Sequence, residues 1–116
     1  FIQMSSLELE NIFKNKSFDL IWIDGDHLNP QVTIDIFQCL KLIKNNGVIC
    51  VDDILKDDEI LKKGVNKEYI SGDSFKTLEY FNHLEYLKTS YLLKRVSRRN
   101  LDGKKFISIS SLKDLT

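Results

Sequence analysis

Two short apolar runs, each followed at once by acidic residues, dominate the hydrophobic and polar pattern of the chain. The first, FDLIWI, spans residues 18–23 and leads into the tetrapeptide DGDH at 24–27. The second, VICV, spans residues 48–51 and leads into a pair of aspartates at 52–53. Near-continuous apolar runs of this length are typical of strands buried on both faces of a parallel sheet. We therefore predict two buried strands that both end in carboxylates.

The segment between these strands has the pattern of an amphipathic helix. Asn29 is a favourable N-cap, and Pro30 suits the first helical position. The polar stretch KNNG ends the helix and places Gly47 for a left-handed C-cap. Strand, helix and strand over residues 18–54 make a βαβ unit, so we expect the two strands to be parallel. One face of the helix carries the apolar residues Val32, Ile36, Cys39, Leu40 and Ile43.

The flanking segments add weaker elements to this central unit. Upstream, residues 1–4 are interpreted as a strand remnant, and Ser5 and Glu8 have the spacing of a capping box at the start of a helix. Downstream, the polar residues 55–73 predict a mobile loop. Residues 74–116 predict a helix and then two antiparallel strands at the edge of the sheet. The 116 residues are thus interpreted as a single α/β domain.

Composition narrows the class of protein. The chain is 42% hydrophobic, and its 17 basic and 17 acidic residues cancel, so charge gives no argument for a nucleic acid or an anionic membrane as partner. No apolar run approaches the roughly 18 residues of a membrane span, and no signal-peptide pattern is present. Cys39 and Cys50 lie in apolar patterns, as buried thiols of a reducing compartment do, which favours a cytoplasmic protein.

The acidic residues at the two strand ends form the candidate site. In an open α/β sheet, ligands bind beyond the carboxyl ends of the strands, and neighbouring strands lie about 4.8 Å apart. Three or four of the aspartates are therefore expected to converge, and their mutual repulsion favours a divalent cation bound through oxygen. Beside them, His27 is suited to general-base chemistry near neutral pH. The residues concerned are Asp24, Asp26, Asp52 and Asp53.

A purely structural interpretation stands beside this one. Aspartates are common at strand ends as caps and Asx turns, and a loop histidine often has no catalytic role. Trp22, inside the first strand, is interpreted as a core residue. The basic stretch KRVSRR at 94–99 is interpreted as a solvated strand end, because the net charge of the chain is zero.

The stretch FDLIWIDGDHLNPQVTIDIFQCLKLIKNNGVICVDDI, residues 18–54, resembles the second half of class I S-adenosylmethionine-dependent methyltransferases. More narrowly, it is similar to small-molecule O-methyltransferases in which one strand ends in IDGDH and the next in DD or DN. The resemblance implies a Rossmann-like sheet of which this chain is the C-terminal part, with the first two strands missing. The family binds its methyl donor with a glycine-rich turn, and the sequence contains no G-x-G. Cofactor-binding residues are therefore not assigned within this chain.

Carried over to this sequence, the resemblance implies roles for the strand-end residues. Asp24, Asp52 and Asp53 would be ligands to Mg²⁺ or another divalent cation, which would hold the acceptor hydroxyl and lower its pKa. His27 would be the general base, and Asp26 would be an outer partner of the metal site or a capping residue. The implied reaction is methyl transfer from S-adenosylmethionine to a small-molecule hydroxyl. As a fragment, the chain alone is expected to be inactive, and its exposed edge strand leaves a homodimer open.

Three alternatives remain open at this level. Asp24-Gly25-Asp26 has the D-x-D form with which nucleotide-sugar glycosyltransferases hold Mn²⁺ and a diphosphate. A phosphoryl-transfer fold with an aspartate nucleophile would need a serine or threonine near Asp26, which DGDHLN lacks. A non-catalytic binding module derived from a methyltransferase would account for the missing donor-binding turn.

Overall fold

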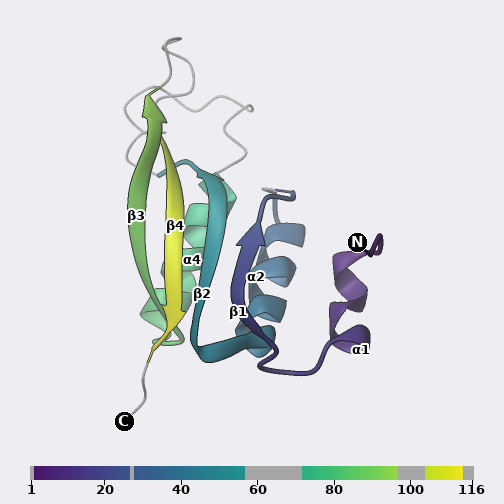
Figure 1. The fold of residues 1–116 in the computed structure, drawn as a ribbon. Coiled ribbons are helices and arrows are strands. Elements are labelled where there is room, and N and C mark those ends of the chain that lie inside the picture. Colours follow the sequence, from purple (N-terminus) through teal and green to yellow (C-terminus); the bar gives the residue numbers. More distant parts are fainter. Residues whose placement is uncertain (1, 27, 57–71, 97–103, 114–116) are drawn as a thin grey trace.

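The structure, a computed structural model, describes residues 2–26, 28–56, 72–96 and 104–113. Within these residues, one mixed sheet has the strand order β1-β2-β4-β3 (Figure 1). The predicted α/β class is therefore confirmed. In chain order the elements are η1 (Ser6–Glu8), α1 (Leu9–Ile12), β1 (Phe18–Ile23), α2 (Gln31–Leu42), β2 (Ile43–Ile54), α4 (Gly72–His83), β3 (Leu87–Val96) and β4 (Lys104–Leu112).

The pairing of the strands follows the sequence pattern. Strand β1 runs parallel to β2, as the βαβ unit requires, with Ile23 beside Val51. Strand β4 is antiparallel to both β2 and β3, which confirms the predicted antiparallel pair and places β3 at the edge. At the other edge of the described sheet, β1 has β2 as its neighbour.

Helices α2 and α4 lie on the same side of the sheet and enclose the core (Figure 1). Side chains alternate between the two faces of a strand, so every second residue of each strand points toward these helices. Strand β1 contributes Ile21 and Ile23 to this core, and β2 contributes Ile49 and Val51. The helices contribute the buried residues Val32, Ile36, Cys39, Leu78 and Phe81.

The opposite face of the sheet carries apolar side chains that remain exposed. Leu20 is 61% exposed and Trp22 is 51% exposed. The expectation that Trp22 belongs to the core is therefore wrong, because it alternates with Ile21 and Ile23 and points away from α2 and α4. An apolar run predicts a strand, but it does not reveal which of its faces is covered.

Both ends of α2 differ from the sequence expectation. The N-cap is Pro30 rather than Asn29, whose side-chain oxygen instead accepts a hydrogen bond from Thr33 Oγ1 at 2.5 Å. The helix ends at Leu42, and Gly47 lies inside β2 rather than at a left-handed C-cap. A Cβ atom at Gly47 would lie 2.6 Å from the Ile43 side chain and 3.0 Å from the Asp19 carbonyl oxygen. Glycine is needed there for a close approach of two strands, not for a turn.

The upstream segment also departs from the prediction. Residues 2–4 form no strand, since no described strand lies beside them to pair with their backbone groups. Ser5 is the N-cap of η1, as predicted, and its Oγ accepts a hydrogen bond from the Leu7 amide at 3.3 Å. Most of the predicted loop at 55–73 and the predicted turn after β3 lie outside the described residues.

The two cysteines are free and buried, as predicted. Burial, with a smaller contribution from the charge of Asp35, raises the pKa of the Cys39 thiol to about 12. Among the described residues, no helix has the length and apolar character needed to cross a membrane.

Strand β2 contains a bulge at its carboxyl end, where the acidic pair lies. Val51 pairs with Ser108 and Ile54 with Phe106, so Asp52 and Asp53 together oppose a single residue of β4. Asp53 adopts a φ of 52°, in the left-handed region that is uncommon for residues other than glycine. Such a bulge redirects side chains that would otherwise point to opposite faces of the sheet.

The placement of the core predicts different stabilities for two apolar truncations. Ile36→Ala should lower the free energy of unfolding by about 2–5 kcal/mol, because Ile36 is fully buried and the truncation leaves a cavity. Leu20→Ala should change it by about 0.5 kcal/mol or less, because Leu20 is already in contact with solvent. Urea unfolding followed by circular dichroism measures both. Equal losses would contradict a core confined to the side of α2 and α4.

The left-handed backbone at Asp53 predicts an order of stability among substitutions that all remove the carboxylate. Asp53→Gly should be more stable than Asp53→Val by about 1–2 kcal/mol, because only glycine adopts a positive φ without a steric cost. Urea unfolding of the two variants gives the difference directly. A valine variant as stable as the glycine variant would show that the bulge does not hold this conformation.

Candidate functional site

Three of the predicted site residues meet at the carboxyl ends of β1 and β2. Asp24 follows β1 directly, and the parallel pairing of Ile23 with Val51 sets it beside Asp52. Asp24, Asp52 and Asp53 each offer one carboxylate oxygen, and these three atoms lie within 4.8 Å of one another. Asp24 is exposed, whereas Asp52 is only 8% exposed. The expected convergence is present, and the group opens to solvent on the side of Asp24.

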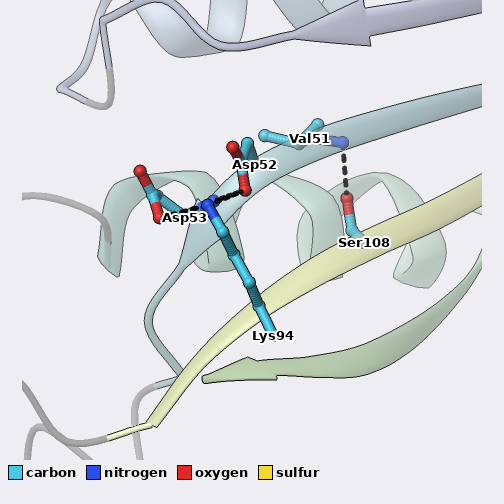
Figure 2. A network of polar contacts seen from close by, with 5 residues as sticks. All are labelled: Val51, Asp52, Asp53, Lys94 and Ser108. Atoms are coloured by element: carbon cyan, nitrogen blue, oxygen red, sulfur yellow. Dashed lines mark hydrogen bonds and ion pairs between the residues drawn. The ribbon is translucent and has the colours of Figure 1, made fainter. Parts of the chain in front are cut away.

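The β2 bulge explains how two adjacent aspartates can act on the same side of the strand. The Asp53 backbone amide donates a hydrogen bond to Asp52 Oδ1 at 2.8 Å, which holds the Asp52 carboxylate against the backbone of the bulge. Where the ladder to β4 is interrupted, the Val51 amide donates to Ser108 Oγ at 3.2 Å (Figure 2). Ser108 is fully buried, and a buried amide without a hydrogen-bond acceptor is costly. The Ser108 hydroxyl therefore provides the acceptor that the Val51 amide needs.

A lysine from β3 reaches this carboxylate pair. Lys94 Nζ donates to Asp52 Oδ1 at 2.8 Å and to Asp53 Oδ1 at 3.1 Å (Figure 2). The hydrogen bond to Asp52 and then the one to Asp53 raise the pKa of the Lys94 ammonium, because both favour its charged form. Lys94 therefore keeps a positive charge inside the acidic group.

Sequence reasoning missed Lys94 because it treated the basic stretch as a solvated strand end. The signal lies in the register of the sheet, since Phe106 of β4 pairs with Leu93 on one side and with Ile54 on the other. That double pairing brings the end of β3 level with the end of β2. It depends on contacts between residues some forty positions apart, which a local pattern does not contain.

The remaining predicted residues lie in the loop after β1. Asp26 Oδ1 accepts a hydrogen bond from the Leu28 amide at 2.9 Å, an Asx turn, so Asp26 acts as a capping residue within the loop. The Asn29 amide donates to Asp73 Oδ2 at 3.0 Å, which ties the loop to the start of α4. His27 lies outside the described residues, and its role as general base stays a prediction.

The donor set at the strand ends suits a hard divalent cation. Three carboxylate oxygens within 4.8 Å of one another provide the ligand type that Mg²⁺ and Ca²⁺ prefer. The Lys94 ammonium forms ion pairs with two of these three carboxylates, Asp52 and Asp53, at 2.8 Å and 3.1 Å. The residues present therefore fit the metal that the family resemblance implies.

A separate depression lies at the opposite end of the sheet. It has a volume of about 790 Å³ and is lined by residues around the amino-terminal end of β2, among them Lys16, Asn45 and Tyr86. None of the carboxylates at the strand ends lines it. The depression is therefore not an extension of the carboxylate site.

Sequence comparison gives one family match. Residues 1–54 match the family model described as a methyltransferase domain. This segment includes β1, α2 and β2 and all three converging aspartates. A comparison with curated proteins gives no match.

Solved structures with the same fold cover nearly the whole chain. Cofactor-bound Rv0187 from MTB aligns with a TM-score of 0.68 and 19% identity, over 95% of this chain and 47% of that one. The O-methyltransferase from Bacillus cereus in complex with SAH gives 0.59 and 21%, over 93% and 46%. The O-methyltransferase TomG from Streptomyces achromogenes, involved in tomaymycin synthesis and solved with SAM, gives 0.55 and 14%, over 94% and 45%.

The chain thus spans about half the length of the solved structures that it matches. At these identities the structural likeness shows a shared fold, and the family match adds an independent observation from sequence over the βαβ unit. The chain is therefore similar to a methyltransferase domain over its βαβ unit, and it shares an α/β fold with these solved structures.

Proposed function

We propose that this chain provides the metal- and acceptor-binding part of an S-adenosylmethionine-dependent O-methyltransferase that acts on a small-molecule hydroxyl. The observation that carries the proposal is the convergence of Asp24, Asp52 and Asp53 at the carboxyl ends of two parallel strands. Ligands of open α/β sheets bind at this edge. The two free, buried cysteines suit a reducing, cytoplasmic location for such an enzyme.

In the proposed site, Asp24, Asp52 and Asp53 hold a divalent cation. When bound, the cation acts as a Lewis acid that positions the acceptor hydroxyl and lowers its pKa. The bulge in β2 fixes Asp52 and Asp53, and the β1–β2 pairing fixes Asp24 beside them. The protein's own contribution is therefore a prearranged set of oxygen ligands on strand ends, which is more precise than a set carried by long loops.

The proposed reaction moves one methyl group and one proton. A bond forms between the acceptor oxygen and the methyl carbon as the bond from that carbon to the sulfonium sulfur breaks, which leaves a neutral thioether. The hydroxyl proton passes to His27, the proposed general base. Alignment of oxygen, carbon and sulfur supplies much of the acceleration, since the bound reactants no longer need to find each other in solution.

The methyl donor is proposed to bind mainly through residues outside these 116. The sequence has no G-x-G, the turn that would approach the donor closely. The solved structures with this fold, two of which are described as complexes with SAM or SAH, are about twice as long as this chain. A donor-binding half beyond the present sequence accounts for both observations.

The glycosyltransferase alternative loses support from the geometry. A D-x-D site requires Asp24 and Asp26 to face one cation, but the group of close carboxylates joins Asp24 to Asp52 and Asp53. Asp26 instead closes an Asx turn with the Leu28 amide. Preference for S-adenosylmethionine over a nucleotide-sugar separates the two functions in solution.

The first test is the mass and activity of the protein isolated from its natural source. We expect an intact mass above the 13.5 kDa of this chain, by roughly 10 kDa or more if a donor-binding half of ordinary domain size is present. That protein should transfer a radiolabelled methyl group from S-adenosylmethionine to members of a panel of small phenols and alcohols. Removal of divalent cations with EDTA should abolish the transfer, and Mg²⁺ should restore it. A protein that binds nucleotide-sugars but not S-adenosylmethionine would contradict the proposal.

Substitution of the proposed ligands gives a second test. Asp24→Asn should weaken Mn²⁺ binding by about tenfold or more, because it removes a full charge from the ligand set of a hard cation. Asp26→Asn is the matched control and should change the affinity little, since asparagine forms the same Asx turn. Isothermal titration calorimetry with Mn²⁺ measures both. Equal losses in the two variants would argue against Asp24 as a ligand.

The proposed base gives a third test. His27→Gln should lower kcat by about a hundredfold or more, the usual contribution of a positioned general base. It should leave Mn²⁺ affinity unchanged, because His27 is not among the proposed ligands. Steady-state kinetics on the full-length protein and a calorimetric titration measure the two quantities. A variant with normal kcat would remove His27 from the mechanism.

A further inference from the structure

The Lys94 ammonium lies where a cation bound by Asp52 and Asp53 would be expected. We propose that Lys94 is a displaceable counter-cation, so that its ammonium and a divalent metal ion compete for these two carboxylates. The inference rests on the proposed metal site and adds a residue that governs its occupancy. It starts from the two short contacts of Lys94 Nζ, 2.8 Å to Asp52 Oδ1 and 3.1 Å to Asp53 Oδ1.

The charges of the site explain why a counter-cation is useful. Three carboxylates whose oxygens lie within 4.8 Å of one another repel each other strongly when no cation is present. Asp52 is almost fully buried, so water screens it poorly. The Lys94 ammonium offsets part of this repulsion and lets the site keep its arrangement before a metal ion arrives.

The Lys94 ammonium and a divalent metal ion cannot contact the same carboxylate oxygens at the same time without a free-energy cost. A metal ion bound to Asp52 Oδ1 at about 2.1 Å would lie no more than about 5 Å from an ammonium that contacts the same oxygen. Like charges at such a separation repel substantially in a partly buried site. Occupancy by the metal ion is therefore coupled to departure of the lysine.

Of the three side chains in this contact, Lys94 has more freedom to move than Asp52 and Asp53. The β2 bulge sets the backbone of Asp52 and Asp53, and the hydrogen bond from the Asp53 amide to Asp52 Oδ1 holds the Asp52 carboxylate. Lys94 comes from the edge strand β3 on a flexible four-carbon stem, and its side chain is 29% exposed. The ammonium can leave for solvent without disturbing the sheet, whereas the carboxylates stay in place.

The test is the metal affinity of a variant that lacks the ammonium. Lys94→Met should bind Mn²⁺ about tenfold or more tightly than the wild type in calorimetric titrations at fixed pH and ionic strength, because the competing charge is gone. Lys88→Met removes a charge from an exposed position on the same strand and should leave the affinity unchanged. Lys94→Arg keeps the charge and should keep the weaker affinity of the wild type.

Thermal melting supplies a readout that does not require activity. Without added metal, Lys94→Met should melt at a lower temperature than the wild type, and Mn²⁺ should raise its melting temperature by a larger amount. If Lys94→Met does not fold, Lys94→Gln tests the same loss of charge with a polar side chain. Equal or weaker Mn²⁺ affinity in the neutral variants would overturn the proposal, because Lys94 would then be independent of the metal ion or help to bind it.

The outcome is distinguishable from failure of the proposed function. If no variant binds Mn²⁺, both the competition and the proposed metal site are overturned, while S-adenosylmethionine binding by the full-length protein still reports on the methyltransferase activity. If the neutral variants gain Mn²⁺ affinity but the full-length protein does not bind S-adenosylmethionine, the competition stands and the proposed reaction is overturned.

Discussion

The candidate site depends on one local break in a regular strand. In an unbroken strand, Asp52 and Asp53 would point to opposite faces of the sheet, one toward the helices and one away from them. The bulge at these residues, with Asp53 at a positive φ, allows both carboxylates to contact the same lysine nitrogen. Backbone strain of this kind persists where the surrounding structure enforces it, and here the buried Ser108 hydroxyl compensates the interrupted ladder.

The parallel pairing of β1 and β2 then adds the third carboxylate. Because parallel strands end at the same edge of a sheet, the register that sets Ile23 beside Val51 also brings Asp24 to the acidic pair. The helix that connects these strands must pack on the sheet for this register to hold, and the fully buried Ile36 of α2 serves that purpose. The stability of the core and the geometry of the site are thus linked through the βαβ unit.

Much of this arrangement could be predicted from the sequence, because its determinants are local. The length of the apolar runs gave the two parallel strands, and the helical spacing of Val32, Ile36 and Cys39 gave the helix between them. The details that escaped prediction depend on contacts between distant segments. Gly47 allows β2 to lie close to the Asp19 carbonyl oxygen of β1 and leaves room for the Ile43 side chain, and it does not end a helix. Lys94 acquires its partners only through the register of β3, β4 and β2.

The exposed face of the sheet connects the fold to the proposed function. Parallel strands are usually covered on both faces, yet α2 and α4 both lie on one face of the described sheet (Figure 1). On the other face, Leu20 and Trp22 are largely exposed. Burial of these apolar side chains would be favourable, so this face is a surface that the proposed donor-binding half outside these 116 residues can use. Across the described sheet, Asp24 follows β1 on one side of the acidic pair and Lys94 lies on β3 on the other side, so the two sides of the proposed metal site differ in charge.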